Sequence, residues 1–294
     1  MRRRAPEDDG QGMTAPLSVP DLAALHRCAS DGTLELLYQP EVDLATGAIV
    51  AMEGLLRWHS DEGQVGPGAF LDAAERTGDT VAIGEWVLTT GAAEVAAWQG
   101  LRGGARQLWL NVSASQVRAA GFVDLVASTV AAHGLPRDLL GLEVSESSLR
   151  ELGLDAGPVL ADLRAAGVAL AVDDFTSWYA TLGAIDTLPV SAVKLGQRHV
   201  RGVDETPYEP VAATVVRAAH ERGLYVVAEG VETWGEAARL TELGCDRAHG
   251  WLFSSAQRSD RARWLMQQGT GWRDSVVTPL DVAKPFVPSP RARV

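Results

Sequence analysis

Residues 156–175, AGPVLADLRAAGVALAVDDF, carry the local pattern on which the fold prediction rests. Over 156–166 the apolar residues recur at intervals of three and four, which predicts a helix with one apolar face. Residues 168–172 are all apolar, and a run of this length is typical of a buried strand. Asp173 and Asp174 follow the run directly. The stretch is therefore interpreted as a helix, a buried strand and a polar strand end, which form one unit of an α/β fold.

The same unit is repeated outward along the chain in both directions. Short apolar runs occur at 34–38, 49–56, 108–112, 139–144, 168–172, 192–195, 224–228 and, more weakly, 247–253. Segments of helical period lie between them at 68–77, 80–98, 116–133, 156–166, 208–222 and 234–243. Strands that alternate with helices predict parallel strands joined by crossover helices. Seven or eight such strands in roughly 250 residues favour a (β/α)8 TIM-like barrel over an open sheet.

Composition and charge exclude several classes of protein. The chain has 26 Lys and Arg and 38 Asp and Glu, and a net charge of −12 disfavours binding a nucleic-acid polymer through its phosphates. The run 165–172 is the longest stretch of apolar residues and glycine, and it is too short to span a membrane. Cys28 and Cys245 stand far apart, which supports neither a disulfide framework nor a thiolate zinc site. These features predict a soluble cytoplasmic protein without membrane contact.

The two ends of the 294-residue chain differ from the part between them. Residues 1–20 are rich in charge, glycine and proline and lack periodicity, and four prolines interrupt the last stretch. We therefore predict a disordered N-terminal tail at 1–20, one barrel domain at 21–268 and a proline-containing C-terminal tail at 269–294.

Polar side chains stand at or just beyond the ends of six successive apolar runs. In a parallel barrel the carboxyl ends of the strands meet at one face, so these groups are expected to converge into one acidic cup. Crowded carboxylates repel one another unless a cation neutralises them, and oxygen ligands favour Mg²⁺ or Mn²⁺. Each acid taken singly could instead cap the following helix. The set comprises Glu53, Asn111, Glu143, Glu146, Asp173, Asp174, Lys194, Glu229 and Glu232.

The order and spacing of several short motifs between about 34 and 253 resemble the EAL family of cyclic di-GMP phosphodiesterases. The motifs are Tyr38-Gln39-Pro40, Glu53-Gly54-Leu55-Leu56-Arg57-Trp58, Asn111-Val112-Ser113, Glu143-Val144-Ser145-Glu146, Asp173-Asp174-Phe175, Lys194 and Ala228-Glu229-Gly230-Val231-Glu232-Thr233. The resemblance implies a barrel that binds two Mg²⁺ or Mn²⁺ ions and hydrolyses cyclic di-GMP to linear pGpG. It also implies a possible homodimer formed through the barrel, and the chain's regulator is expected to be another, unknown protein.

The resemblance also implies a role for each matching residue. Metal ligands would be Glu53, Asn111, Glu143 and Asp173, with Asp173 and Asp174 at the second ion. Lys194 would hold the attacking water or a phosphate oxygen, and Glu229 would act as the general base or as an additional partner of the metal site. The substrate-binding residues would be Gln39, Leu55, Arg57, Glu232 and His249. Coupling of the site to a dimer interface would involve Glu146, Thr176 and Trp178.

Four positions depart from the family pattern near this site. Thr176 and Trp178 replace two loop glycines, which implies a stiffer loop of different shape. Gly196 removes a carboxylate close to the second metal, and His249 replaces a glutamine. The retained ligands favour a phosphodiesterase of reduced activity, whereas the departures favour a catalytically inactive cyclic di-GMP receptor or an interaction module. The sequence leaves both alternatives open.

Overall fold

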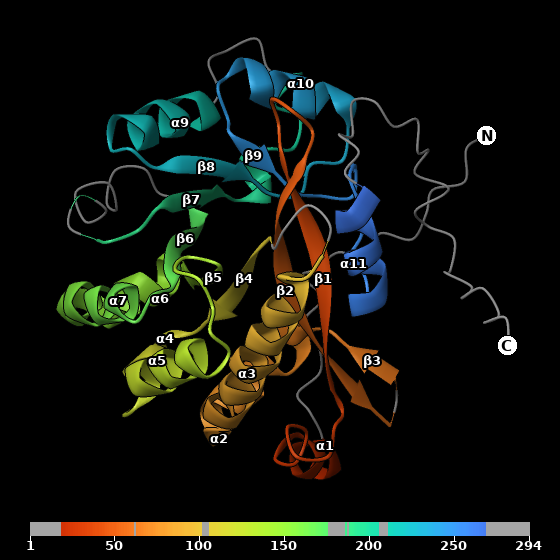
Figure 1. Cartoon of the computed structure of the whole chain (residues 1–294), viewed down its shortest axis with the longest axis vertical. Helices are drawn as coiled ribbons and strands as arrows, with labels where there is room; N and C mark the ends of the chain where they lie inside the picture. Colours follow the sequence, from red (N-terminus) through yellow and green to blue (C-terminus); the bar gives the residue numbers. More distant parts are fainter. Residues whose placement is uncertain are drawn as a thin grey trace, which may run out of the picture.

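Eight strands close into a barrel in this computed structural model, which describes residues 19–61, 63–101, 106–175, 186, 188–205 and 211–268 (Figure 1). The sheet runs in the order β1-β9-β8-β7-β6-β5-β4-β2, and pairing of β1 with β2 closes it. A short ninth strand extends β2 at the margin. The strands are β1 (Leu34–Asp43), β2 (Ile49–Ser60), β3 (Gly63–Val65), β4 (Gln107–Val112), β5 (Leu140–Ser145), β6 (Ala169–Phe175), β7 (Ala192–Leu195), β8 (Tyr225–Ala228) and β9 (Arg247–Ala248).

Helices surround the barrel and cover the outer faces of its strands (Figure 1). All eight apolar runs contain a strand, and the segments of helical period contain helices, so the (β/α)8 prediction is confirmed. None of the helices in the described ranges has the length and apolar character needed to cross a bilayer. The helices are α1 (Val19–Leu25), α2 (Leu71–Thr77), α3 (Thr80–Trp98), α4 (Ala114–Arg118), α5 (Phe122–Ala132), α6 (Glu146–Leu152), α7 (Ala156–Ala165), α9 (Val211–Glu221), α10 (Trp234–Glu242) and α11 (Ser259–Gln268).

The direction of β1 differs from the expectation that all strands are parallel. β1 pairs antiparallel with both β2 and β9, whereas the pairs from β2 through β4 to β9 are parallel. Only residues 44–48 separate β1 from β2, which is too short for a crossover helix and forces a hairpin. Apolar periodicity gives no information on strand direction, so the sequence pattern missed this reversal.

The barrel interior beneath the predicted cup is filled mainly by one large side chain. Trp109 packs there with Ala51, Ala169, Ala171 and Ala192. A Cβ on Gly141 would lie 2.2 Å from the Trp109 ring, so a residue without a side chain is needed opposite it. Side chains two residues apart on a strand point to the same face, so each strand carries a polar residue one step above this apolar layer.

Residues 1–18 and 269–294 lie outside the described part of the chain, as do 176–185. Most of the two predicted tails falls in these ranges, and so do Thr176 and Trp178.

Candidate functional site

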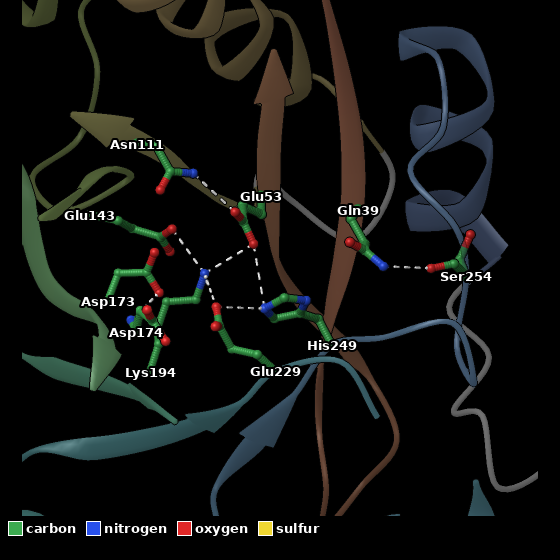
Figure 2. A network of polar contacts seen from close by, with 10 residues as sticks. All are labelled: Gln39, Glu53, Asn111, Glu143, Asp173, Asp174, Lys194, Glu229, His249 and Ser254. Carbon is green, nitrogen blue, oxygen red and sulfur yellow. Dashed lines mark hydrogen bonds and ion pairs between the residues drawn. The ribbon is translucent and has the colours of Figure 1, made fainter. Parts of the chain in front are cut away.

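Side chains from seven strands or strand ends converge inside one end of the barrel (Figure 2). Glu53 lies on β2, Asp173 on β6 and Lys194 on β7, each two residues beyond an alanine of the Trp109 layer. Glu143 on β5 lies two residues beyond Gly141, which faces the Trp109 ring. Asn111 on β4 pairs in register with Glu143 on β5. Two more residues follow strands directly, namely Glu229 after β8 and His249 after β9. Strand register and alternation therefore assemble a single polar cluster from residues distant in sequence.

Lys194 lies at the centre of this cluster and is only 1% exposed. Its ammonium Nζ lies 2.9 Å from Glu143 Oε2, 3.0 Å from Glu53 Oε2 and 3.0 Å from Glu229 Oε1. Three carboxylates thus surround one positive charge, and a buried charge needs such pairing to be tolerated. When all three carboxylates are ionised, they and Lys194 together carry a net negative charge.

Asn111 and His249 both contact Glu53, and His249 also contacts Glu229. The Asn111 amide donates to Glu53 Oε1 at 3.0 Å. Nε2 of His249 lies 3.2 Å from Glu229 Oε1 and 3.4 Å from Glu53 Oε2. Each of the two glutamates is therefore held by more than one partner, which limits its rotation.

The pKa values of the carboxylates in the cluster are shifted in opposite directions. Burial would raise the pKa of Glu229 and of Glu53, but in both cases Lys194 and His249 outweigh burial and lower it. Burial raises the pKa of Glu143 well above its usual value, against the attraction of Lys194. Burial, together with the negative charge of Glu229, also raises the pKa of Asp173 to about 7. Without a further cation, the cluster therefore favours protons on Glu143 and Asp173.

Asp174 occupies the space that a side chain at Gly196 would need. The backbone N–H of Asp174 donates to Asp173 Oδ1 at 2.7 Å, and its φ of 47° lies in the left-handed region. A Cβ on Gly196 would lie 2.5 Å from Asp174 Oδ1. The carboxylate that the family has at position 196 is absent here, and the carboxylate of Asp174 lies where a side chain at 196 would begin.

Of the predicted substrate residues, His249 lies within the cluster, and the others lie around it. The amide of Gln39 turns away and donates to the Ser254 carbonyl at 2.9 Å (Figure 2). Arg57, from β2, donates to the Leu56 carbonyl at 2.8 Å. Glu232 pairs with Arg201 at 3.1 Å on the exposed rim.

A cavity of about 410 Å³ adjoins the cluster on the β2 and β4 side. Leu55 and Asn111 both line it, together with Ile83 and Ser145. Its walls are partly apolar and partly polar, which is typical of a small-molecule site. Glu146, beside Ser145, is buried and pairs with Arg150 at 3.3 Å instead.

The donor set fits a divalent cation on two observations. Oε1 of Glu143 is buried and has no hydrogen-bond partner within the described residues, although a carboxylate oxygen of this kind normally has one. Ligand atoms of Glu53, Glu229 and His249 lie within 4.8 Å of one another. The family resemblance implied Glu53 as a ligand and Glu229 as the general base or an additional metal-site partner, whereas it gave His249 a substrate-binding role.

Sequence reasoning missed one supporting residue, Glu236. Its Oε2 accepts hydrogen bonds from the backbone N–H groups of Glu232 and Thr233, at 2.9 and 3.0 Å. The spacing Thr233-x-x-Glu236 is the capping-box signature, so the sequence contained the signal. Glu236 thereby fixes the loop that follows Glu229.

The family model described as "EAL domain" matches residues 22–256. The chain belongs to the EAL domain family. The family includes cyclic di-GMP phosphodiesterases, and this EAL domain reads Glu53-Gly54-Leu55 at the position of the family's name.

Several characterised and uncharacterised proteins resemble this EAL domain. An uncharacterized protein of Mycobacterium tuberculosis H37Rv is 35% identical, over 80% of this chain and 79% of its own. The bifunctional diguanylate cyclase/cyclic di-GMP phosphodiesterase MucR of Pseudomonas aeruginosa is 36% identical, over 74% of this chain and 32% of its own. A solved structure of the PaMucR phosphodiesterase in complex with c-di-GMP has a TM-score of 0.77 at 32% identity, covering 83% of this chain and all of that one. The chain spans about a third of the length of the first curated relatives that it matches.

Proposed function

We propose that this EAL domain is a metal-dependent phosphodiesterase that hydrolyses cyclic di-GMP to linear pGpG, with two Mg²⁺ or Mn²⁺ ions. The observation that carries the proposal is the convergence of Glu53, Glu143 and Glu229 on Lys194, with Asn111 bound to Glu53. Related proteins of the same family are phosphodiesterases, and a related barrel has been solved with c-di-GMP.

The proposed metal ligands are the oxygen-bearing side chains of the cluster. These are Glu53, Asn111, Glu143 and Asp173 at one ion, and Asp173 with Asp174 at the other. When bound, divalent cations lower the pKa of an attacking water and offset the charge that develops on phosphate oxygens.

The chain's own residues would bind the substrate and move the proton. Glu229 is ionised because Lys194 and His249 lower its pKa, so its carboxylate would accept the proton of the attacking water. The water oxygen would bond to phosphorus as the P–O3′ bond breaks, and the leaving O3′ would take up a proton from solvent. The product carries a 5′-phosphate and a free 3′-hydroxyl. The Lys194 ammonium would hold the water or a phosphate oxygen, and the Arg57 guanidinium would bind the phosphate.

The remaining assigned residues would serve the nucleotide and the coupling of the site. Leu55, which lines the cavity, would contact the nucleotide, and Gln39, Glu232 and His249 would complete the substrate site. Glu146, Thr176 and Trp178 would link the site to a dimer interface. Residues 21–268 would form the domain, and light scattering on the purified chain tests the proposed homodimer.

Product analysis tests the phosphodiesterase directly. Purified protein incubated with cyclic di-GMP and Mn²⁺ or Mg²⁺ should yield pGpG by chromatography, and Glu53→Ala should abolish the yield. Glu242→Ala is the matched control, because Glu242 is an exposed carboxylate of α10 whose side chain is 67% accessible. Absence of pGpG after long incubation would rule out the enzyme.

The second candidate is a catalytically inactive cyclic di-GMP receptor. Gly196 favours it, because the rim has no carboxylate at that position. Calorimetry in Ca²⁺ separates the candidates: binding without turnover indicates a receptor, and absence of both binding and turnover contradicts the two functions together.

A further inference from the structure

His249 lies against the carboxylates of the cluster in a geometry that suits a metal ligand. Its side chain is 10% exposed, and Nε2 faces Oε1 of Glu229 at 3.2 Å and Oε2 of Glu53 at 3.4 Å. Nδ1 is buried and has no partner within the described residues. In the metal-free chain Nε2 therefore carries a proton, because it faces two carboxylate oxygens that can only accept. A cation that took the place of this proton would meet the Nε2 lone pair at the same position.

These spacings match those between two ligands of one ion. Ligand atoms at about 2.0–2.2 Å from a divalent cation lie roughly 3.0 Å apart in octahedral geometry and roughly 3.5 Å apart in tetrahedral geometry. The two His249 contacts fall in this interval. His249 Nε2 thus stands at coordination-shell distances from both carboxylate oxygens, and the ligand atoms of the three residues lie within 4.8 Å of one another.

The charge of the cluster leaves room for a divalent ion beside Lys194. Glu53, Glu143 and Glu229 contact a single ammonium, so full ionisation of the three leaves two negative charges uncompensated. Lys194 uses Oε2 of Glu53 and Oε1 of Glu229, and a carboxylate oxygen has a second lone pair for another partner. The unpartnered Oε1 of Glu143 is an independent sign that the cluster lacks a cation.

We propose that His249 Nε2 is a ligand, with Glu53 and Glu229, of a divalent ion in this site, and that it makes the site select a first-row transition ion over Mg²⁺. The proposal rests on the metal dependence given under the proposed function and narrows it. Mg²⁺ prefers oxygen ligands and keeps much of its hydration water. An imidazole nitrogen binds Co²⁺ and Zn²⁺ most strongly, Mn²⁺ less strongly and Mg²⁺ least. Residue 249 is thereby a determinant of metal choice.

Pulsed electron paramagnetic resonance on the Mn²⁺-loaded full chain tests the ligand directly. A directly bound imidazole should give a ¹⁴N coupling, and His249→Gln should lose it. His199→Gln is the matched control, because His199 is near Asp174 at the same rim and should leave the coupling intact. Absence of the coupling in the wild-type protein, or its loss in His199→Gln alone, would overturn the proposal.

Calorimetric titration with Mn²⁺ and Mg²⁺ measures the selectivity. The ratio of the two affinities should fall by about tenfold or more in His249→Gln, which corresponds to roughly 1.4 kcal/mol. An unchanged ratio would contradict the selectivity. If His249→Gln fails to fold, the wild-type ¹⁴N coupling and affinity ratio still decide the matter.

Failure of this inference and failure of the proposed function give different results. A ¹⁴N coupling without any pGpG would support His249 as a ligand while contradicting the phosphodiesterase. Equal pGpG formation with Mg²⁺ and Mn²⁺, without the coupling, would support the enzyme and contradict the role of His249.

Discussion

Two adjacent layers of the barrel interior come from the same strands but are held in different ways. The lower layer consists of Trp109 and small residues such as Ala51 and Ala192. The upper layer, two residues further along these strands, places Glu53 and Lys194 in ionic contact. Packing volume holds the lower layer together, whereas mutual compensation of charges holds the upper one. The same strands therefore support a packed apolar layer and a charged layer. We expect substitutions in the two layers to have different effects.

Lys194→Met should have the largest effect on stability. Removing the ammonium leaves the buried carboxylates of Glu53 and Glu143 and the partly exposed one of Glu229 without their cation. Breaking a buried pair of this kind costs about 3–5 kcal/mol in the free energy of unfolding. Urea unfolding of the metal-free protein measures the loss. Mn²⁺ should restore part of it, because the ion supplies positive charge to the same carboxylates. No loss in the metal-free variant would show that the cluster tolerates its charge without Lys194.

Gly141→Ala should disturb the lower layer by overpacking. The added Cβ would lie 2.2 Å from the Trp109 ring, and overpacking of this kind costs about 1–3 kcal/mol. Mn²⁺ should not restore the loss, since the strain does not involve charge. Gly157→Ala in α7 is the control, because its added Cβ meets no atom within 4 Å. Rescue of Gly141→Ala by Mn²⁺ would contradict the distinction between the layers.

The pH dependence of the metal-free protein should report the upper layer. The pKa of Asp173 is about 7 in the folded protein, and its ordinary value is 3.8. Between these two pH values the folded protein keeps a proton on Asp173 that the unfolded chain has released. Stability from this group is therefore greatest at acidic pH and is lost as the pH rises toward about 7. The raised pKa values of Glu143 and His249 act with the same sign. Thermal unfolding from pH 5 to 7.5 in chelator should show a falling midpoint, and Asp173→Asn should flatten the curve.

Gly196→Asp should have the smallest effect, and that effect should depend on Asp174. In the wild-type background the new side chain would meet the Asp174 carboxylate, so we expect little gain in pGpG formation. In Asp174→Ala the space is open, and adding Gly196→Asp should raise the rate by about tenfold, or roughly 1.4 kcal/mol. Gly196→Ala in the same background controls for the added Cβ. Equal gains in the rate of pGpG formation in both backgrounds would show that carboxylates at 174 and 196 do not compete for the same space.

The sequence predicted much of the fold and the residues of the cluster for identifiable reasons. Apolar runs and helical periods located all eight barrel strands, because burial of one or both faces dictates these patterns. The acids Glu143 and Asp173 were identifiable because they stand near the carboxyl ends of their strands, whereas Glu53 lies inside the longer β2. Strand direction was not identifiable for β1, since a hairpin and a crossover leave the same apolar run.

The sequence by itself determined the barrel, its family and which strand ends carry charge. Only the tertiary structure decided that Lys194 is shared by three glutamates, that Asp174 lies against Gly196, and that His249 joins Glu53 and Glu229. The physical reason is that periodicity records which face of a strand is buried. Contacts among side chains from different strands depend instead on register, barrel closure and charge balance, and these arise only when the strands meet.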